Sequence, residues 1–265
     1  MIAELKDSGN DANSALFSLI TVSYFDQEFL VSGSNNGSIN VWNIDSQVII
    51  KRLKSNNSGI WALASFYVGD KLKIASGSKD SIIKIIDFNQ MSIDHILYGH
   101  QHPIKSLFVI KQDNNPLNNI PILISGCNKD IIMWNPVKGY KIRQINAHKG
   151  DIHTITTIKF NNKKYIMSAS RDGFVIIWNP TNGKQVKSLS KFRNSKSVSI
   201  ININEKDFII TASNNSIKIW NPINENLIDT IAVNEKEHFF NLKIIQLGTK
   251  IVLVGANGKK IRVWS

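Results

Sequence analysis

The sequence is poor in cysteine and has no long apolar run, and both absences exclude classes of protein. Cys127 is the single cysteine among 265 residues, so neither a disulfide framework within the chain nor a zinc site of several thiolates can form. No segment reaches about 18 consecutive apolar residues, which excludes a helical membrane span. Glu4, Lys6 and Asp7 interrupt the N-terminal segment, so we expect no secretory signal. We therefore expect a cytoplasmic or nuclear protein.

Arginine is also scarce, which limits what the net charge of +12 can mean. The chain holds 27 lysines but 5 arginines, together with 43 isoleucines and 31 asparagines, a combination typical of an AT-rich coding sequence. Surfaces that bind phosphate commonly use arginine, because its planar guanidinium contacts two oxygens at once. The lysine excess therefore does not by itself predict nucleic-acid binding.

A short motif recurs along the whole chain. Tryptophan closes an apolar run five times, and Ile86 stands at the place of a sixth tryptophan. The closing residues are Trp42, Ile86, Trp134, Trp178, Trp220 and Trp264, separated by 44, 48, 44, 42 and 44 residues. Self-similarity at this period predicts a repeat protein of six similar units.

Each unit shows the same order of short apolar segments separated by turn residues. In the clearest copy the pattern predicts strands near residues 152–160, 164–168, 174–178 and 184–189. The third segment, FVIIW, has consecutive apolar residues, which indicates a sheet covered on both faces. The sequence thus predicts an all-β protein of four-stranded units.

The repeat resembles that of the WD-repeat β-propeller family. Residues 167–179, MSASRDGFVIIWN, are close to the family's typical repeat, and His100 and His148 follow small residues where the family places a Gly-His pair. The resemblance covers essentially the whole chain and implies a six-bladed β-propeller of four-stranded antiparallel blades in one domain. The repeats would span residues 13–54, 55–98, 99–146, 147–190, 191–233, and 234–265 together with 1–8.

The last repeat ends at its third strand, so a fourth strand must come from elsewhere. Residues 2–6 are apolar at alternate positions and precede the first repeat at a suitable distance. We expect the N-terminal strand to complete the last blade and to close the ring, which would also remove the exposed sheet edges of an open array.

The resemblance also implies a buried hydrogen-bond chain within a blade, formed by His148, Ser168, Asp172 and Trp178. Buried imidazole and indole N–H groups need partners, and this chain would supply them. A catalytic pair of His148 and Asp172 is the alternative, and the structural role is favoured because the spacing is that of a blade's own fastening. Other repeats hold only part of the set.

No catalytic motif appears in the sequence. It lacks a phosphate-binding loop, a His-Glu-x-x-His pair and a Gly-x-Ser-x-Gly turn. His100 and His102 are close enough in sequence to suggest a metal site, but two solvated imidazoles are the simpler interpretation. We predict no catalytic, metal-binding or cofactor-binding residues and no enzymatic activity.

The resemblance implies that partners bind at one face of the ring, where the first strands begin and the second strands end. The candidate residues there are Trp61, Lys79, Lys105, His153 and Arg171. Tryptophan and arginine often dominate binding energy at interfaces. Trp61 lies outside the repeated tryptophan position, and it either packs between blades or contacts a partner.

We therefore expect a monomeric ring that acts as an adaptor, holding protein or peptide partners within a larger complex. The alternative is an RNA- or ribonucleoprotein-associated propeller, suggested by a basic stretch without acidic residues. Its members are Lys184, Lys187, Lys191, Arg193 and Lys196. The same lysines could instead protect an edge strand from aggregation.

Overall fold

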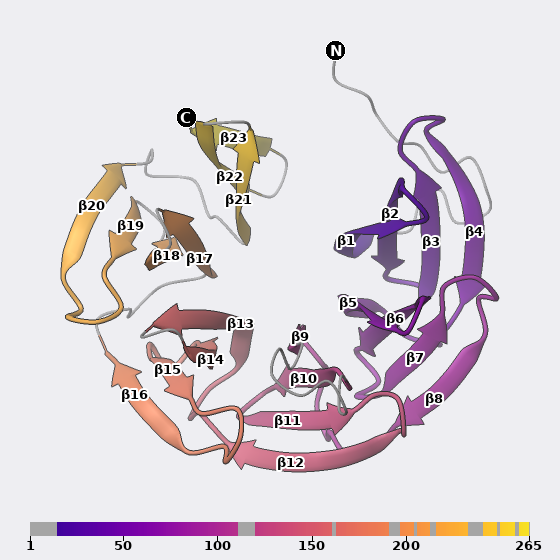
Figure 1. The fold of residues 1–265 in the computed structure, drawn as a ribbon, viewed down its shortest axis with the longest axis horizontal. Helices are drawn as coiled ribbons and strands as arrows, with labels where there is room; N and C mark the ends of the chain where they lie inside the picture. The colour runs from indigo at the N-terminus through magenta and orange to yellow at the C-terminus, as the bar shows by residue number, and fades with distance from the viewer. Residues whose placement is uncertain are drawn as a thin grey trace. The chain divides into compact units, whose positions relative to one another are not determined.

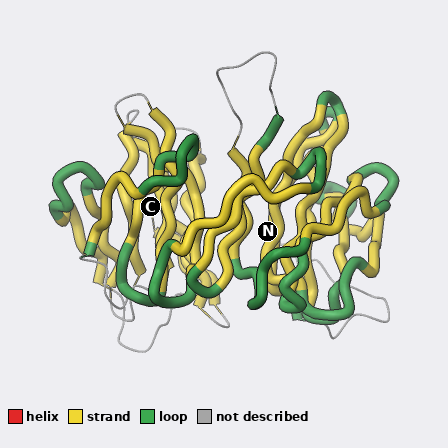
Figure 2. Tube along the Cα trace, turned by 90° about the horizontal axis from the view of Figure 1, so that it is seen from below, coloured by secondary structure: helices red, strands yellow, loops and turns green. Residues whose placement is uncertain are grey.

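The computed structural model describes residues 15–110, 120–160, 163–190, 197–203, 206–212, 216–232, 241–247, 250–257 and 260–264. These residues form strands and turns without a helix, which confirms the all-β prediction (Figure 2). In these ranges there is accordingly no helix long and apolar enough to cross a membrane. The chain divides into two compact units, Met1–Asn146 and Ala147–Ser265.

The described strands of the first unit form three four-stranded antiparallel sheets (Figure 1). In strand order, the first sheet holds β1 (Leu16–Tyr24), β2 (Gln27–Ser34), β3 (Ser38–Asn43) and β4 (Val48–Lys54). The second holds β5 (Ile60–Val68), β6 (Lys71–Ser78), β7 (Ile83–Asp87) and β8 (Ile93–Leu97). The third holds β9 (Ser106–Ile110), β10 (Ile122–Cys127), β11 (Asp130–Asn135) and β12 (Tyr140–Asn146).

The second unit continues the same pattern. The fourth sheet holds β13 (Ile152–Phe160), β14 (Lys163–Ser170), β15 (Val175–Trp178) and β16 (Gln185–Leu189), close to the four predicted ranges. The fifth holds β17 (Ser197–Ile203), β18 (Lys206–Ala212), β19 (Ser216–Trp220) and β20 (Leu227–Ala232). Among the described residues the sixth sheet has three strands, β21 (Asn241–Leu247), β22 (Lys250–Asn257) and β23 (Lys260–Trp264). Residues 1–8, expected as its fourth strand, lie outside the described residues.

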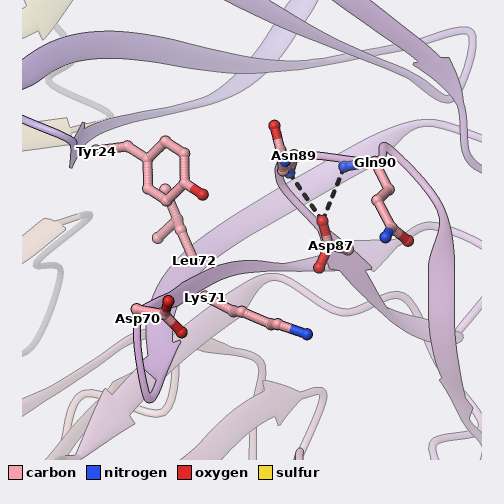
Figure 3. A pocket seen from close by; sticks show the side chains of 7 residues that line it. All are labelled: Tyr24, Asp70, Lys71, Leu72, Asp87, Asn89 and Gln90. Atoms are coloured by element: carbon pink, nitrogen blue, oxygen red, sulfur yellow. Dashed lines mark hydrogen bonds between the residues drawn. The ribbon is translucent and has the colours of Figure 1, made fainter.

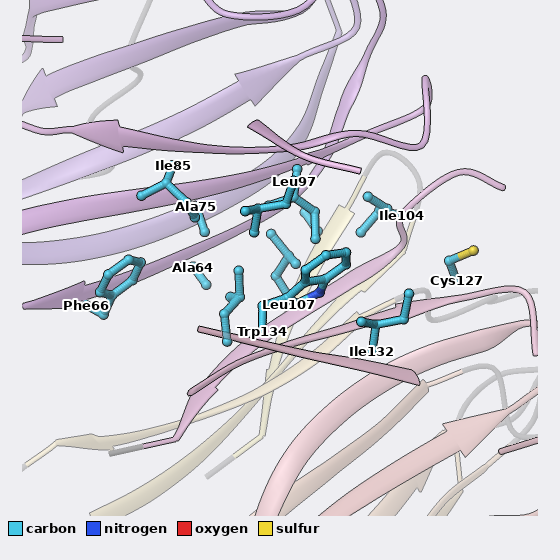
Figure 4. Packing of buried hydrophobic residues seen from close by; sticks show 13 residues of the cluster. Ala64, Phe66, Ala75, Ile85, Leu97, Ile104, Leu107, Cys127, Ile132 and Trp134 are labelled. Atoms are coloured by element: carbon cyan, nitrogen blue, oxygen red, sulfur yellow. The ribbon is translucent and has the colours of Figure 1, made fainter. Parts of the chain in front are cut away.

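Within each unit, neighbouring sheets pack face to face. In the first unit β5 contacts both β1 and β9, so the first strands of the three sheets lie next to one another, and the fourth strands lie on the far side of each sheet (Figure 1). Buried residues of the second and third sheets form one cluster, in which Ile85 and Leu97 pack near Ile104, Leu107 and Trp134 (Figure 4). The consecutive apolar residues of β7 are thus covered on both faces, by the first and the third sheet, as the sequence predicts for third strands.

Small residues on the second strands let the sheets approach closely. A Cβ atom added to Gly33 would lie 2.6 Å from Cγ2 of Ile60, and one added to Gly77 would lie 2.6 Å from Cγ2 of Ile104. At each glycine, an isoleucine of the following sheet fills the space where a side chain would lie. Ile60 begins β5, and Ile104 precedes β9. The repeated glycine is a packing requirement, because any side chain there would overlap its neighbour.

The first strand of the first sheet differs from its counterparts. Ile60 and Leu63 of the second sheet have exposed fractions of 0% and 7%, because the first sheet covers them. The equivalent residues of the first sheet, Leu16 and Leu19, are 53% and 50% exposed. Ile60 and Leu63 precede the closing residue Ile86 by 26 and 23 residues, and Leu16 and Leu19 precede the closing residue Trp42 by the same numbers. The face of the first sheet that carries Leu16 and Leu19 thus has the apolar residues that another sheet covers at the equivalent positions of the second sheet.

Within each unit, hydrogen bonds from fourth strands connect one sheet to the next, at β4, β8 and β16. Lys51 Nζ donates to the carbonyl oxygens of Phe88 and Asn89 at 3.2 and 2.9 Å, and His95 Nε2 lies 2.8 Å from the carbonyl oxygen of Val137. In the second unit, Lys187 Nζ donates at 3.2 Å to the carbonyl oxygen of Pro222. Each acceptor lies in the turn between the third and fourth strands of the following sheet.

These three residues, the inter-sheet donors, occupy one position of the repeat. Each follows its closing residue, Trp42, Ile86 or Trp178, by nine residues. Each also pairs with the residue just before the closing residue, where the register shifts by a bulge. The bulge therefore sets which side chain of the fourth strand reaches the next sheet.

Replacement of an inter-sheet donor should loosen the contact between two sheets. We expect Lys51→Met to lower the free energy of unfolding by about 1 kcal/mol, because two backbone carbonyls lose a charged donor. Lys71→Met, at an exposed lysine for which the described structure gives no such contact, should change it by less than about 0.5 kcal/mol. Urea unfolding measures both variants, and equal effects would contradict a specific role for Lys51.

Candidate functional site

A buried hydrogen-bond chain crosses the fourth sheet. Trp178 Nε1 donates to Ser168 Oγ at 2.8 Å, Ser168 Oγ lies 2.8 Å from His148 Nε2, and His148 Nδ1 lies 3.0 Å from Asp172 Oδ2. The Asp172 carboxylate also accepts backbone N–H groups of Lys149 and Phe174 at 2.8 and 3.0 Å. The chain therefore joins β14, β15, the turn between them and the segment before β13.

The electrostatics of this chain favour one protonation state. Burial lowers the pKa of His148 and outweighs the Asp172 carboxylate, which raises it, so the imidazole is neutral near pH 7. Burial alone would raise the pKa of Asp172, but the backbone N–H groups and His148 outweigh it, so the pKa lies below its usual value. A neutral His148 that donates from Nδ1 to Asp172 accepts from Ser168 at Nε2, and every polar group has a partner.

Serine, histidine and aspartate in this order also form the catalytic triad of hydrolases, but the geometry here does not allow that chemistry. Ser168 has no exposed surface, and its hydroxyl oxygen already accepts the indole N–H of Trp178. A substrate carbonyl cannot approach a nucleophile that is enclosed on all sides. The arrangement fastens the sheet instead.

The same position is filled differently in the other sheets. In the third sheet Trp134 Nε1 donates to Ser125 Oγ at 2.8 Å, and His100 Nε2 lies 2.6 Å from that oxygen. Tryptophan also donates to the hydroxyl in the first and fifth sheets, over 2.9 Å in each. In the second sheet the buried Ser76 hydroxyl makes no hydrogen bond in the described structure, because Ile86 replaces the tryptophan.

His100 makes the stability of the first unit depend on pH. Burial, with a smaller effect from Lys141, lowers the pKa of His100 to about 4, below its value of about 6.5 in an unfolded chain. Between these values the unfolded state binds a proton that the folded state does not, so stability falls as the pH drops from about 6.5 to 4. We expect a loss of about 2–3 kcal/mol across this window, to be measured by urea unfolding. His100→Gln should flatten the profile, and an unchanged slope would contradict this role.

Ser76 and Ser168 allow a matched test of the fastening. Both are completely buried, and both occupy the same place in their repeats, ten residues before the closing residue. Ser168→Ala leaves the indole N–H of Trp178 and the Nε2 atom of His148 without a partner, so we expect a loss of about 2–3 kcal/mol in the free energy of unfolding. Ser76→Ala removes an unsatisfied hydroxyl and should be neutral or stabilising. Chemical denaturation of both variants measures the difference, and similar losses would contradict the account.

Three of the predicted partner-binding residues lie together in the first unit. The backbone N–H of Lys79 donates to the carbonyl oxygen of Gly59 at 2.8 Å, which places the β6–β7 turn beside the start of β5, where Trp61 stands. Ile104 N–H donates to the carbonyl oxygen of Ser78, so Lys105 lies at the same turn. Trp61 is half-buried and Lys79 is exposed.

Phe17 lies beside Trp61 and is not among the partner-binding residues that the sequence predicts. Its ring meets Trp61 edge to face, with centroids 6.3 Å apart, and it is 49% exposed. Phe17, Trp61 and His153 each stand at a bulge in a first strand, 25 residues before the closing residue of their unit. That constant spacing would have identified Phe17. We call Phe17, Trp61, Lys79 and Lys105 the aromatic-lysine cluster.

The other two candidates lie in the second unit. The backbone N–H of Arg171 donates to the carbonyl oxygen of Asp151 at 2.8 Å, as Lys79 does to Gly59 in the second sheet. His153 is the bulged residue of β13, and Arg171 is exposed in the β14–β15 turn. The two residues repeat the positions of Trp61 and Lys79.

The basic stretch is described only in part. Lys191, Arg193 and Lys196 lie outside the described residues. Lys187 is an inter-sheet donor, so its ammonium group is already bound to backbone carbonyls, while Lys184 is exposed before β16. Over the described ranges, no group of three histidine, cysteine, aspartate or glutamate residues is placed to hold a metal ion.

Sequence comparisons identify the repeat. Residues 14–43, 47–87 and 139–179 match the family model described as WD domain, G-beta repeat, and the second match includes the copy closed by Ile86. Nuclear distribution protein nudF of Aspergillus flavus is 33% identical over 118 residues, 43% of this chain and 24% of that protein. Cell division control protein 4 of Saccharomyces cerevisiae is 20% identical over 222 residues, 77% of this chain and 28% of that protein. The chain thus spans about a quarter of the length of these curated relatives.

Solved structures share the fold. The computationally designed Ika8 protein aligns with 98% of this chain and 73% of its own, with a TM-score of 0.71 and 22% identity. A chain in the crystal structure of the Mitotic Checkpoint Complex aligns with 96% of this chain and 76% of its own, with a TM-score of 0.77 and 17% identity. Together with the four-stranded antiparallel sheets, these alignments show a β-propeller-like fold.

Proposed function

This chain is a WD-repeat protein, and we propose that it is a non-enzymatic adaptor that holds protein or peptide partners within a larger complex. WD-repeat propellers generally serve as scaffolds for protein interactions, and one solved structure of this fold is part of a checkpoint assembly. The observation that carries the proposal is the aromatic-lysine cluster, where Phe17 and Trp61 present an edge-to-face pair beside Lys79. A partly exposed aromatic pair next to lysines is typical of a binding hot spot.

The buried residues support the same function. The one serine-histidine-aspartate arrangement among the described residues is enclosed and fully hydrogen-bonded, so it does not supply a reaction centre. Rigid sheets with exposed turns at their ends suit binding by preformed loops, which costs little conformational entropy. We assign the partner surface to Trp61, Lys79, Lys105, His153 and Arg171, extended by Phe17, in a cytoplasmic or nuclear protein.

Affinity capture from native lysate tests the adaptor function. We expect Trp61→Ala to reduce the retained partner protein about tenfold or more, because a buried tryptophan anchor contributes about 2 kcal/mol or more. Tyr140→Ala, at an exposed aromatic on β12, should leave capture unchanged. Quantitative mass spectrometry with and without nuclease measures both variants. Loss of all partners with nuclease would contradict the proposal and favour an RNA-associated propeller that uses the basic stretch.

A closed ring would hold the binding loops in a fixed arrangement. We propose that residues 1–265 form one six-bladed propeller. Residues 1–8 would supply the fourth strand of the sixth sheet. The exposure of Leu16 and Leu19 supports closure, because their counterparts in the second sheet are covered by a neighbouring sheet. Gly255 supports it further, since it precedes Trp264 by nine residues, as Gly33 precedes Trp42.

Deletion of residues 1–8 tests closure. The sixth sheet would lose its fourth strand and the ring its fastening, so we expect the melting temperature to fall by about 5 °C or more, as for a loss of several kcal/mol. Deletion of residues 111–118, in the connection between β9 and β10, removes the same number of residues and should have a smaller effect. Differential scanning calorimetry measures both, and equal or negligible shifts would contradict closure.

A further inference from the structure

A small pocket lies at the end of the first unit opposite to the aromatic-lysine cluster. The β1–β2, β5–β6 and β7–β8 turns enclose it, and its volume is about 150 Å³ (Figure 3). Lys71 at the start of β6 lines the pocket, whereas Lys79 of the cluster follows the end of the same strand. The pocket therefore belongs to a different surface from the proposed partner site.

One wall of the pocket is fixed by internal hydrogen bonds. The Asp87 carboxylate accepts the backbone N–H groups of Asn89 and Gln90 at 2.9 and 2.8 Å (Figure 3). It also binds Lys73 Nζ at 2.8 Å. Burial alone would raise the pKa of Asp87, but Lys73 and these N–H groups outweigh it and lower the pKa. The Asp87 carboxylate is thus ionised near pH 7, and it fixes the backbone of the turn from which Asn89 and Gln90 line the pocket.

The opposite wall combines an aromatic ring with an available carboxylate. Tyr24, Leu72 and Asp70 lie on this side (Figure 3). Asp70 is exposed, and neither its carboxylate nor the ammonium group of Lys71 makes a hydrogen bond or ion pair within the described structure. An unpaired carboxylate beside an aromatic ring is a site for a cation.

An aromatic surface continues outward from the pocket. The ring of Phe25 meets that of Tyr24 with centroids 4.4 Å apart, and Tyr24 in turn meets the buried Phe88 at 5.3 Å. Phe25 is 76% exposed, and no other large hydrophobic side chain in the described ranges is more exposed. Such exposure of a phenylalanine beside a polar pocket marks a binding surface.

The size and the chemistry select one kind of occupant. Pockets for small-molecule ligands usually measure about 300–1,000 Å³, so this pocket has room for a single side chain. A guanidinium group is planar and weakly hydrated, stacks on aromatic rings, and binds a carboxylate through two parallel hydrogen bonds. The oxygens of Asn89 and Gln90 can accept its remaining N–H groups. An ammonium group, which is strongly hydrated and lacks the planar face, fits less well.

We propose that this pocket binds an arginine side chain of a partner protein, with an apolar neighbour of that arginine packed on Phe25. The inference goes beyond the proposed function, because it gives the ring a second partner surface with the opposite charge preference. Lys71 is the one cation among the lining residues, and it weakens the binding of a positively charged group. Removal of Asp70 and removal of Lys71 should therefore change the affinity in opposite directions.

The test uses the full chain and a capped pentapeptide of the sequence Gly-Leu-Arg-Leu-Gly. Titration is followed by NMR at the side-chain amide signals of Asn89 and Gln90, and we expect saturable shifts. The same peptide with citrulline, a neutral isostere of arginine, should bind at least about tenfold more weakly. Asp70→Asn should weaken binding of the arginine peptide about fivefold or more, and Lys71→Gln should tighten it severalfold.

Controls separate this surface from the aromatic-lysine cluster and from a folding defect. Trp61→Ala should leave the affinity for the peptide unchanged, and backbone amide spectra of the Asp70 and Lys71 variants should match the parent away from the pocket. Absence of saturation at millimolar peptide, equal binding of the citrulline peptide, or equal affinity of the Asp70→Asn variant would each overturn the proposal.

Discussion

The fold depends on one constraint: each sheet must be covered on both faces. The third strands carry consecutive apolar residues, and β7 buries Ile83, Ile85 and Ile86 almost completely. A single sheet of this composition would expose two apolar faces to water, at a cost of about 25 cal/mol per Å². Glycines such as Gly33 and Gly77 then allow close approach, because the isoleucine of the next sheet occupies the space of their missing side chains. Packing between sheets is thus specified by size as well as by hydrophobicity.

Polar contacts add specificity to this apolar packing at two places of the repeat. Inside a sheet, an indole N–H bound to a hydroxyl holds the third strand to the second, and the fourth sheet extends this chain through His148 to Asp172. Between sheets, the inter-sheet donors bind carbonyl oxygens of the following turn. The second sheet lacks the first kind of contact, since Ile86 replaces tryptophan, but takes part in the second through Lys51 and His95. Apolar packing of Ile86 substitutes for the missing hydrogen bond.

Much of this architecture is predictable from the sequence, because repeats impose the same constraint at a constant spacing. The pattern of apolar segments and turn residues predicts the four strands of β13–β16, and the family resemblance implies the place of the buried chain. Phe17 precedes Trp42 by 25 residues, as Trp61 precedes Ile86, so the repeat spacing could have identified it. It is not among the predicted residues because phenylalanine is neither charged nor rare in this sequence. The inter-sheet donors follow their closing residues by nine positions, but lysine and histidine share no sequence signature that predicts one role. Their common function emerges only from the bulge that aligns them.

The pocket beside Phe25 could not have been predicted, for a physical reason. The repeat places the turns that line it, since Asp70 follows the equivalent Asp26 by 44 residues, but the character of the pocket depends on which charges are already paired. Asp87 is bound by Lys73 and by backbone N–H groups, whereas Asp70 is not, and the sequence does not distinguish these two carboxylates. The same argument applies to Lys187, which the sequence groups with a basic stretch and the structure assigns to a backbone contact.

Closure of the six sheets is the central proposal, since it would cover the exposed face of the first sheet and would give the turns a fixed arrangement. Pulsed electron–electron double resonance between spin labels at Thr21→Cys on β1 and Lys260→Cys on β23, with Cys127 replaced by serine, tests it most directly. The account predicts one narrow distance distribution that broadens when residues 1–8 are deleted. A broad distribution in the full chain, or one that the deletion does not change, would contradict closure.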